Sequence, residues 1–245
     1  MSLKFDSYKK LRKDKTKHKV ESWEEYEQRE QEFLKERYLS KEPTISTFVR
    51  ITAGKAKNFK IEIPKNTRPL TDRMKVRIFD VLGSDIANKS VLDLYAGAGS
   101  FALEALSRGA KEATLVDASK QGNIIIQRNV AHTAFLPQAD VIKSKVEDFI
   151  QKYKESDRVW DIIFMDPPYK LYNTKRVEKM ESIINDASSL LPGVRNPKTN
   201  KFKGAFIIKH PKRYPIDKLN LKYIKRVDTY EFGLNSISLY IVKSK

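Results

Sequence analysis

The stretch DIIFMDPPYK places an acid, two prolines and an aromatic ring directly after a short apolar run. The run, residues 162–165, has the length and composition of a buried strand. At its end, Asp166 and the carbonyl of Pro167 can accept the hydrogens of an exocyclic amine, and the ring of Tyr169 can stack on a nucleobase. Because Pro168 follows Pro167, φ is fixed at both positions and the bend is held in advance. This combination predicts a site for an amino base that is flipped out of its helix.

A second motif is the glycine turn in VLDLYAGAGSFALEALSRGA, where an apolar run gives way to an amphipathic helical pattern. Gly97, Gly99 and Ala102 fit the G-x-G-x-x-G/A spacing of nucleotide-binding turns. Asp117 ends the next apolar run, 117 − 93 = 24 residues after Asp93, near the offset of a ribose-binding acid. A carboxylate there accepts both ribose hydroxyls, which favours a cofactor that contains adenosine.

Asp93 separates two classes of cofactor. A nicotinamide dinucleotide needs a helix N-terminus free for its pyrophosphate, which a carboxylate just before the turn would repel. The same carboxylate suits the cationic amino-acid part of S-adenosylmethionine (SAM). The alternative, that Asp93 is only a turn residue, is less favoured. The motif therefore predicts SAM as the donor, with much of the rate supplied by alignment of the amine, the methyl carbon and the sulfur.

Around these motifs, short apolar runs alternate with helical patterns. Strands are predicted at 90–95, 113–117, 139–143, 162–165 and 205–209, helices near 100–108, 120–132, 146–154 and 174–190, and a loop at 192–204. This alternation predicts a parallel sheet covered on both faces. Two β-rich runs around Gly233 predict an antiparallel hairpin at the end. Because the carboxyl ends of parallel strands meet at one edge, the glycine turn, Asp117 and DPPY should border one crevice.

Three further segments precede this pattern. Residues 1–19 are rich in Lys and Arg, and residues 20–45 are rich in Glu with helical spacing. The stretch FVRITAGKAKNFKIEIP predicts a β-hairpin, after which Thr71 or Asp72 can cap a helix that runs to Gly83. We therefore expect an arm with a helical extension (1–45), a hairpin with a helix (46–83) and a main domain (84–245).

Composition narrows the class of protein. Lys plus Arg exceed Asp plus Glu by 48 − 31 = 17, an excess that favours a polyanionic partner, with nucleic acid ahead of an anionic membrane. A basic surface that serves only solubility is the alternative. The chain has no Cys and three His, which argues against disulfides, a thiolate nucleophile and a zinc site. With neither an apolar leader nor a membrane-length run, we expect a bacterial-type cytosol.

From Arg50 onward, the chain resembles the bacterial RsmD-like family of small-subunit (16S) ribosomal RNA guanine-N2 methyltransferases. The motifs that carry the resemblance are RITAGKAKNFKI, TRPLTDRMKVRIFDVL, VLDLYAGAGSFALEALSRGA, FMDPPY and FGLNSISLY. The resemblance implies a Rossmann-like, class I SAM-dependent methyltransferase fold, with a seven-stranded, mostly parallel sheet whose seventh strand is antiparallel. It also implies that the acceptor is one guanine of ribosomal RNA, either free or in a small-subunit assembly intermediate. We expect a monomer.

The resemblance also assigns residues to roles. The catalytic set would be Asp166, Pro167, Pro168 and Tyr169. The SAM-binding set would be Asp93, Tyr95, Ala96, Gly97, Gly99, Asp117, Ala118, Lys145, Val146 and Asp166, with a lid of Arg68, Thr71, Asp72 and Arg73. The RNA-binding set would be Arg50, Lys55, Lys57, Lys60, Arg68 and Arg73. Ion pairing with nearby acids is an equal alternative for Arg68 and Arg73, and no metal is expected.

Two other functions remain open at this point. A DNA adenine-N6 or cytosine-N4 methyltransferase would use the same amine chemistry, although the chain has no separate domain large enough to read a DNA sequence. A non-catalytic RNA-binding assembly factor would keep the fold but would not need Asp166. The segment before residue 46 and the 192–204 loop depart from the family pattern, so the target nucleotide is also open.

Overall fold

The computed structural model describes residues 43–65, 67–173, 177–195 and 203–243. The basic arm and nearly all of the acidic helix expected in the first 45 residues lie outside these ranges. Thr44–Lys245 form one compact unit. Its described residues build a two-stranded sheet and a seven-stranded sheet.

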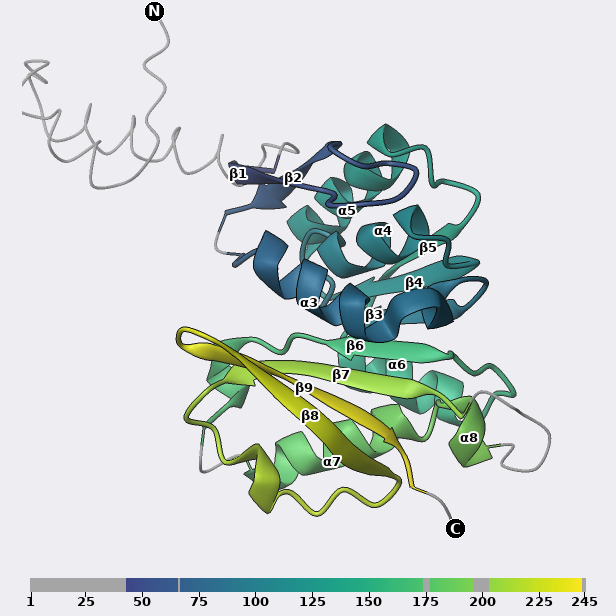
Figure 1. The fold of residues 1–245 in the computed structure, drawn as a ribbon, viewed down its shortest axis with the longest axis vertical. Helices are drawn as coiled ribbons and strands as arrows, with labels where there is room; N and C mark the ends of the chain where they lie inside the picture. Colours follow the sequence, from purple (N-terminus) through teal and green to yellow (C-terminus); the bar gives the residue numbers. More distant parts are fainter. Residues whose placement is uncertain (1–42, 66, 174–176, 196–202, 244–245) are drawn as a thin grey trace, which may run out of the picture. The chain divides into compact units, whose positions relative to one another are not determined.

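The larger sheet carries the glycine turn and DPPY. Its strand order is β5-β4-β3-β6-β7-β9-β8 (Figure 1). The strands are β3 Ser90–Leu94, β4 Glu112–Asp117, β5 Ala139–Lys143, β6 Ile162–Met165, β7 Ala205–Pro211, β8 Ile224–Phe232 and β9 Asn235–Val242. The first five pair in parallel and β9 is antiparallel to both neighbours. The predicted mostly parallel sheet with an antiparallel seventh strand is confirmed.

Helices cover both faces of this sheet. They are α4 Ser100–Ser107, α5 Lys120–His132, α6 Val146–Lys154 and α7 Val177–Ser188. Helices α4 and α5 lie on one face, and α6 and α7 on the other (Figure 1). Along β3, the side chain of Val91 packs in the core on the α4 side of the sheet, and that of Leu92 packs in the core on the α7 side. Each strand therefore reads as a continuous apolar run because both of its faces are buried.

The 192–204 segment differs from the prediction of a loop. It begins with a short helix, α8 Pro192–Arg195. Pro192 occupies the first helical position, where its fixed φ suits a helix and its missing N–H costs no hydrogen bond. The sequence-based interpretation took this proline only as a sign of irregular structure.

The hairpin and the helix ahead of the main sheet form as predicted. Strands β1 Ile45–Arg50 and β2 Lys60–Pro64 pair antiparallel. Helix α3 Asp72–Leu82 begins after Thr71, whose hydroxyl accepts the Met74 N–H at 3.4 Å. The ring of Phe79 in α3 stacks on Phe101, which stacks on Phe164 of β6, with centroid distances of 5.2 and 4.2 Å. This row of rings fixes α3 beside the strand that ends in DPPY.

A buried polar network ties the hairpin to the body. Glu104 of α4 is fully buried and accepts the N–H groups of Thr52 and Ala53 at 2.8 and 3.1 Å. It also accepts from Arg108 Nε at 2.8 Å. Lys75 of α3, 1% exposed, places its Nζ 3.8 Å from the Glu104 carboxylate. Because each buried charge has a partner, one network joins the hairpin, α3 and α4.

Candidate functional site

The glycine turn and the DPPY segment face one cavity. The cavity has a volume of about 40 Å³ and is lined by Asp93, Gly97, Phe164, Asp166 and the segment 67–70. Strands β3 and β6 are neighbours, so the residues that follow them lie side by side. The predicted common crevice is therefore confirmed for the glycine turn and Asp166, whereas Asp117 and the rest of DPPY, Pro167 to Tyr169, are not among the residues that line it.

The segment 67–70 lines this cavity and lies against the glycine turn. Gly97 has a φ of +60°, and a Cβ added there would lie 2.9 Å from Cγ2 of Thr67. The present volume, about 40 Å³, is far below the several hundred Å³ of ordinary small-molecule sites. The cavity in its present form is therefore too small for a nucleoside-sized ligand.

The two acids at the ends of β3 and β4 have different environments. Asp93 is 1% exposed and accepts the Ala102 N–H at 3.2 Å. Burial raises the pKa of Asp93 to about 8. The hydrogen bond from Ala102 lowers the pKa, and the nearby carboxylates of Asp166 and Asp117 raise it further. Asp117 is half-buried and accepts the N–H groups of Gly97 and Ser119, each at 2.8 Å. Asp117 therefore fixes the glycine turn, whereas Asp93 is a largely neutral acid at the cavity wall.

Two residues that line the cavity carry a buried hydroxyl without a partner among the described residues. Tyr95 Oη and Ser100 Oγ are buried with no hydrogen bond among the described residues, and both residues line the cavity. Buried polar atoms are rarely left unsatisfied, so the Ser100 hydroxyl is available to a polar ligand, whereas the Tyr95 hydroxyl lies toward Glu147 of α6. The sequence analysis included Tyr95 but missed Ser100, whose only signal was its place at the start of the helix after the glycine turn.

Asp166 forms an ion pair that the sequence analysis did not foresee. Lys209 Nζ lies 2.6 Å from Asp166 Oδ2, and the two side chains are 5% and 24% exposed. Burial raises the pKa of Asp166, and the adjacent Lys209 ammonium lowers it. The signal was present in AFIIKH, because a lysine in a strand buried on both faces needs a partner.

The remaining DPPY residues differ in exposure. Pro167 is buried, whereas Pro168 and Tyr169 are exposed. The Tyr169 hydroxyl donates to Asn235 Oδ1 at the start of β9. The guanidinium carbon of Arg68 lies 4.6 Å from the centre of the Tyr169 ring. A base that stacks on this face of Tyr169 would therefore replace Arg68.

The structure places the other cofactor candidates around the same edge of the sheet. Ala96 lines the cavity, and Ala118 is exposed directly after β4. Lys145 is the exposed residue ahead of α6, while Val146 is buried beneath it. Gly99 packs inward, since a Cβ there would lie 2.8 Å from the Leu115 side chain.

The candidate RNA-binding residues lie on the hairpin and on the lid. Arg50, Lys55, Lys57 and Lys60 are all exposed. Arg50 Nε lies 3.0 Å from Asp72 Oδ2. The guanidinium carbon of Arg73 lies 6.0 Å from the centre of the Phe232 ring. Both lid arginines, Arg68 and Arg73, thus lie over aromatic rings, a contact that the two alternatives considered from sequence did not include.

The described ranges contain neither a metal-binding cluster nor a helix suited to cross a membrane. In the part of the chain that the structure describes, no cluster of three or more His, Asp or Glu side chains could hold a metal ion. Among the described helices, none combines the length and apolar character needed to cross a membrane.

Comparison with proteins of known sequence places the chain in a family. The family model described as "Conserved hypothetical protein 95" matches residues 49–240. A protein of Buchnera aphidicola (subspecies Baizongia pistaciae) named ribosomal RNA small subunit methyltransferase D is 32% identical over 127 residues, which are 51% of this chain and 63% of that protein. The Escherichia coli K12 protein of the same name is 32% identical over 124 residues, 50% of this chain and 61% of that protein. The alignments thus span less than two thirds of these relatives.

Solved structures share the fold. A chain from Escherichia coli, provisionally named methyltransferase yhhF, aligns with a TM-score of 0.64 at 23% identity, over 81% of this chain and 100% of that chain. A SAM-dependent methyltransferase from Agrobacterium tumefaciens aligns with a TM-score of 0.55 at 15% identity, over 75% of this chain and 67% of that chain. The fold is therefore Rossmann-like. With the family model matched across the hairpin, the glycine turn and DPPY, the chain belongs to the conserved hypothetical protein 95 family, that is, to the RsmD-like proteins.

Proposed function

We propose that this protein transfers a methyl group from SAM to the exocyclic N2 amine of a guanine in small-subunit ribosomal RNA. The observation that carries the proposal is the shared cavity of the glycine turn and Asp166. One motif suits the adenosine-containing donor and the other suits an amino base, and the transfer requires both within one enclosed site.

The residues on the donor side of the cavity fit SAM. Asp93 provides a carboxyl group that an adjacent cationic amino-acid group would hold in its ionised form, and the unpartnered hydroxyl of Ser100 provides a hydrogen bond. Asp117 holds the glycine turn and keeps further lone pairs for ribose hydroxyls. When bound, SAM supplies a methyl group that is already activated by its sulfonium. The protein therefore has to bind, align and exclude water.

On the acceptor side, Asp166 handles the amine hydrogens. An amine loses one proton when it gains a methyl group, and an ionised carboxylate can accept that hydrogen as a hydrogen bond and then as a proton. Burial opposes ionisation of Asp166, while Lys209 favours it. Pro167 and Pro168 hold the bend, so the carboxylate is placed before the base arrives. Tyr169 provides the stacking face once Arg68 moves away.

The proposed substrate class rests on the basic charge of the chain and on the names of its relatives. The excess of 17 basic residues and the exposed cations of the β1–β2 hairpin suit a polyanion. The Buchnera and Escherichia coli relatives are named ribosomal RNA small subunit methyltransferase D, so ribosomal RNA is favoured over DNA. We further propose that the substrate is ribosomal RNA or an assembly intermediate in the cytosol, and that the protein acts as a monomer.

The test is transfer of a radiolabelled methyl group from SAM to small ribosomal subunits isolated from cells without this protein. We expect incorporation into the RNA, and mass mapping of the nucleotides will identify the guanine. Asp166→Ala should abolish transfer, while calorimetry should show nearly unchanged affinity for S-adenosylhomocysteine. Asp140→Ala, an exposed acid on β5, is the matched control. Equal incorporation by Asp166→Ala would remove Asp166 from its proposed role.

A further inference from the structure

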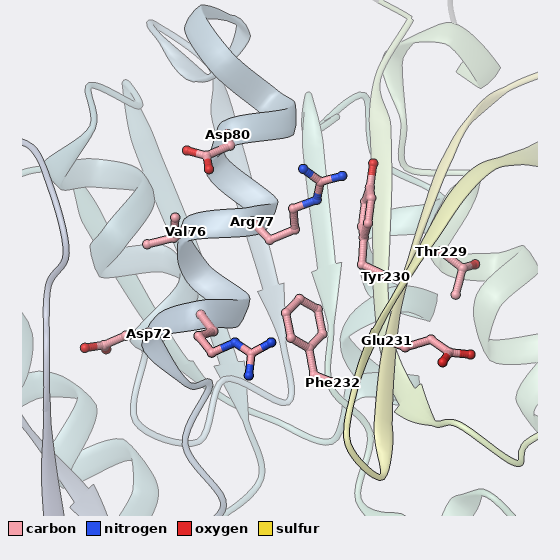
Figure 2. A pocket seen from close by; sticks show the side chains of 9 residues that line it. Asp72, Val76, Arg77, Asp80, Thr229, Tyr230, Glu231 and Phe232 are labelled. Atoms are coloured by element: carbon pink, nitrogen blue, oxygen red, sulfur yellow. The ribbon is translucent and has the colours of Figure 1, made fainter.

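A second hollow lies outside the cavity, between α3 and β8. It has a volume of about 600 Å³, and Arg73, Arg77, Tyr230 and Phe232 are among the residues that line it (Figure 2). We call the part of the hollow that these four residues line the Arg–aromatic groove. The guanidinium carbon of Arg77 lies 4.1 Å from the centre of the Tyr230 ring, and that of Arg73 lies 6.0 Å from the centre of the Phe232 ring. The groove thus contains two pairs of side chains, Arg77 with Tyr230 and Arg73 with Phe232.

The spacing of the four residues follows from the periods of a helix and a strand. Arg73 and Arg77 are four residues apart on α3, which places them on one helix face about 6 Å apart along the axis. Tyr230 and Phe232 are two residues apart on β8, which places them on one strand face about 7 Å apart. The two spacings are similar, so each arginine of α3 lies opposite one aromatic ring of β8.

Three of the acidic side chains around the groove point away from its interior, whereas a fourth, Asp228, lies at the hydroxyl of Tyr230. Figure 2 shows Arg77 directed at Tyr230, with Asp72 and Asp80 on the far side of α3 and Glu231 on the far side of β8. Asp72 pairs with Arg50 and Lys75, and Glu231 pairs with Lys212. Apart from the Asp228 carboxylate beside Tyr230 and Arg77, the side chains that face the groove are therefore cationic or aromatic, with both arginines exposed and both rings half-buried.

One end of the groove adjoins the DPPY segment. Phe232 and Asn235 are opposite each other where β8 turns into β9. Asn235 accepts the hydroxyl hydrogen of Tyr169. Asn235 thus links Phe232 in the groove to Tyr169, the residue proposed to stack on the target base. An RNA strand with a base at Tyr169 can continue into the groove.

We propose that the Arg–aromatic groove binds unpaired nucleotides next to the target guanine, a proposal that rests on the proposed function. The rings of Tyr230 and Phe232 stack on bases, and Arg73 and Arg77 turn from the rings to the phosphates. Stacking suits any base because every base has a π face. Single-stranded RNA is the partner that uses both rings and both cations, whereas an acidic peptide would need only the cations.

Binding of a fluorescein-labelled, ten-nucleotide single-stranded RNA of mixed sequence tests the groove by fluorescence anisotropy. Tyr230→Ala should weaken binding about ten-fold, since stacking accounts for most of each base contact, and Tyr230→Phe should restore it. Tyr223→Ala, which removes an exposed ring before the far end of β8, should leave binding within about two-fold of the wild type. Affinity for a ten-base-pair RNA duplex should not respond to Tyr230→Ala, because paired bases cannot stack on the ring.

A second variant keeps the proposal testable should Tyr230→Ala fail to fold. Arg77→Met should reduce the slope of log Kd against log salt concentration by about one, as expected for one lost phosphate contact. An unchanged Kd for single-stranded RNA in a folded Tyr230→Ala variant would overturn the groove. The proposal would also be contradicted if polyglutamate displaced the RNA equally well from the wild type and from the Tyr230→Ala variant. Failure of the wild type to methylate small subunits would refute the proposed function alone, because the oligonucleotide measurement needs no methyl transfer.

Discussion

Lys75 and Lys209 are both almost fully buried, and each lies beside a buried or half-buried carboxylate, yet the two carboxylates differ in their other contacts. Glu104, the partner of Lys75, also accepts hydrogen bonds from Thr52, Ala53 and Arg108. Asp166, the partner of Lys209, lines a cavity. A carboxylate whose lone pairs are occupied by the fold serves stability, whereas one that faces a cavity beside a single cation can also serve a ligand.

The first variant tests the structural half of this comparison. Glu104→Ala should lower the free energy of unfolding by about 3–5 kcal/mol, because it leaves the N–H groups of Thr52 and Ala53 without their acceptor and removes a buried carboxylate from beside Lys75 and Arg108. Urea denaturation measures the loss. Glu112→Ala is the control, since its pair with Arg158 is partly exposed and should be worth at most about 1 kcal/mol. Similar losses for both variants would show that Glu104 is no more structural than a surface acid.

The second variant tests the functional half. Lys209→Met should raise the pKa of Asp166 further, because the cation that opposes the effect of burial is removed. If transfer needs ionised Asp166, the acid limb of the kcat profile should move to higher pH. Lys209→Arg should restore the profile in part. The exposed Lys218→Met controls for loss of one positive charge, and an unmoved acid limb for Lys209→Met would separate Lys209 from the chemistry.

Asp117 lies between these two extremes, since its oxygens accept two backbone N–H groups at the edge of the proposed site. Asp117→Ala should weaken binding of S-adenosylhomocysteine by about 1.5–3 kcal/mol, through lost charge-assisted hydrogen bonds. Calorimetry measures the dissociation constant, with the exposed Asp85→Ala as the control. An unaltered constant would mean that the ribose lies elsewhere.

Much of this arrangement could be predicted because it depends on local patterns. The helix at 120–132 and the strand at 162–165 have the predicted bounds, since apolar runs broken by Asp, Gly and Pro mark the ends of elements. The shared crevice of Gly97 and Asp166 followed from one rule, that parallel strands end at the same edge of a sheet.

The missed residues depend on lateral order, which no local pattern contains. Lys209 meets Asp166 only because β7 lies beside β6 with Ile208 opposite Met165. Tyr230 meets Arg77 across elements that are far apart in the chain. Glu104 of α4 is buried because the hairpin residues Thr52 and Ala53 cover it. In each case the partner, and therefore the role, comes from tertiary packing.

Asp93 gives the smallest and most specific test, because it is a buried carboxyl that accepts one backbone hydrogen bond from Ala102. Its pKa is raised to about 8 in the folded protein, so folding binds a proton that the unfolded chain releases above about pH 4. The stability that comes from neutral Asp93 is therefore complete below about pH 4 and is lost as the pH rises toward about 8. Between pH 6 and pH 7, the free energy of unfolding of the wild type should fall by about 1.4 kcal/mol relative to Asp93→Asn. Parallel denaturation curves at the two pH values measure this difference, and equal slopes for both proteins would mean that Asp93 is ionised in the fold and has a partner beyond the Ala102 N–H.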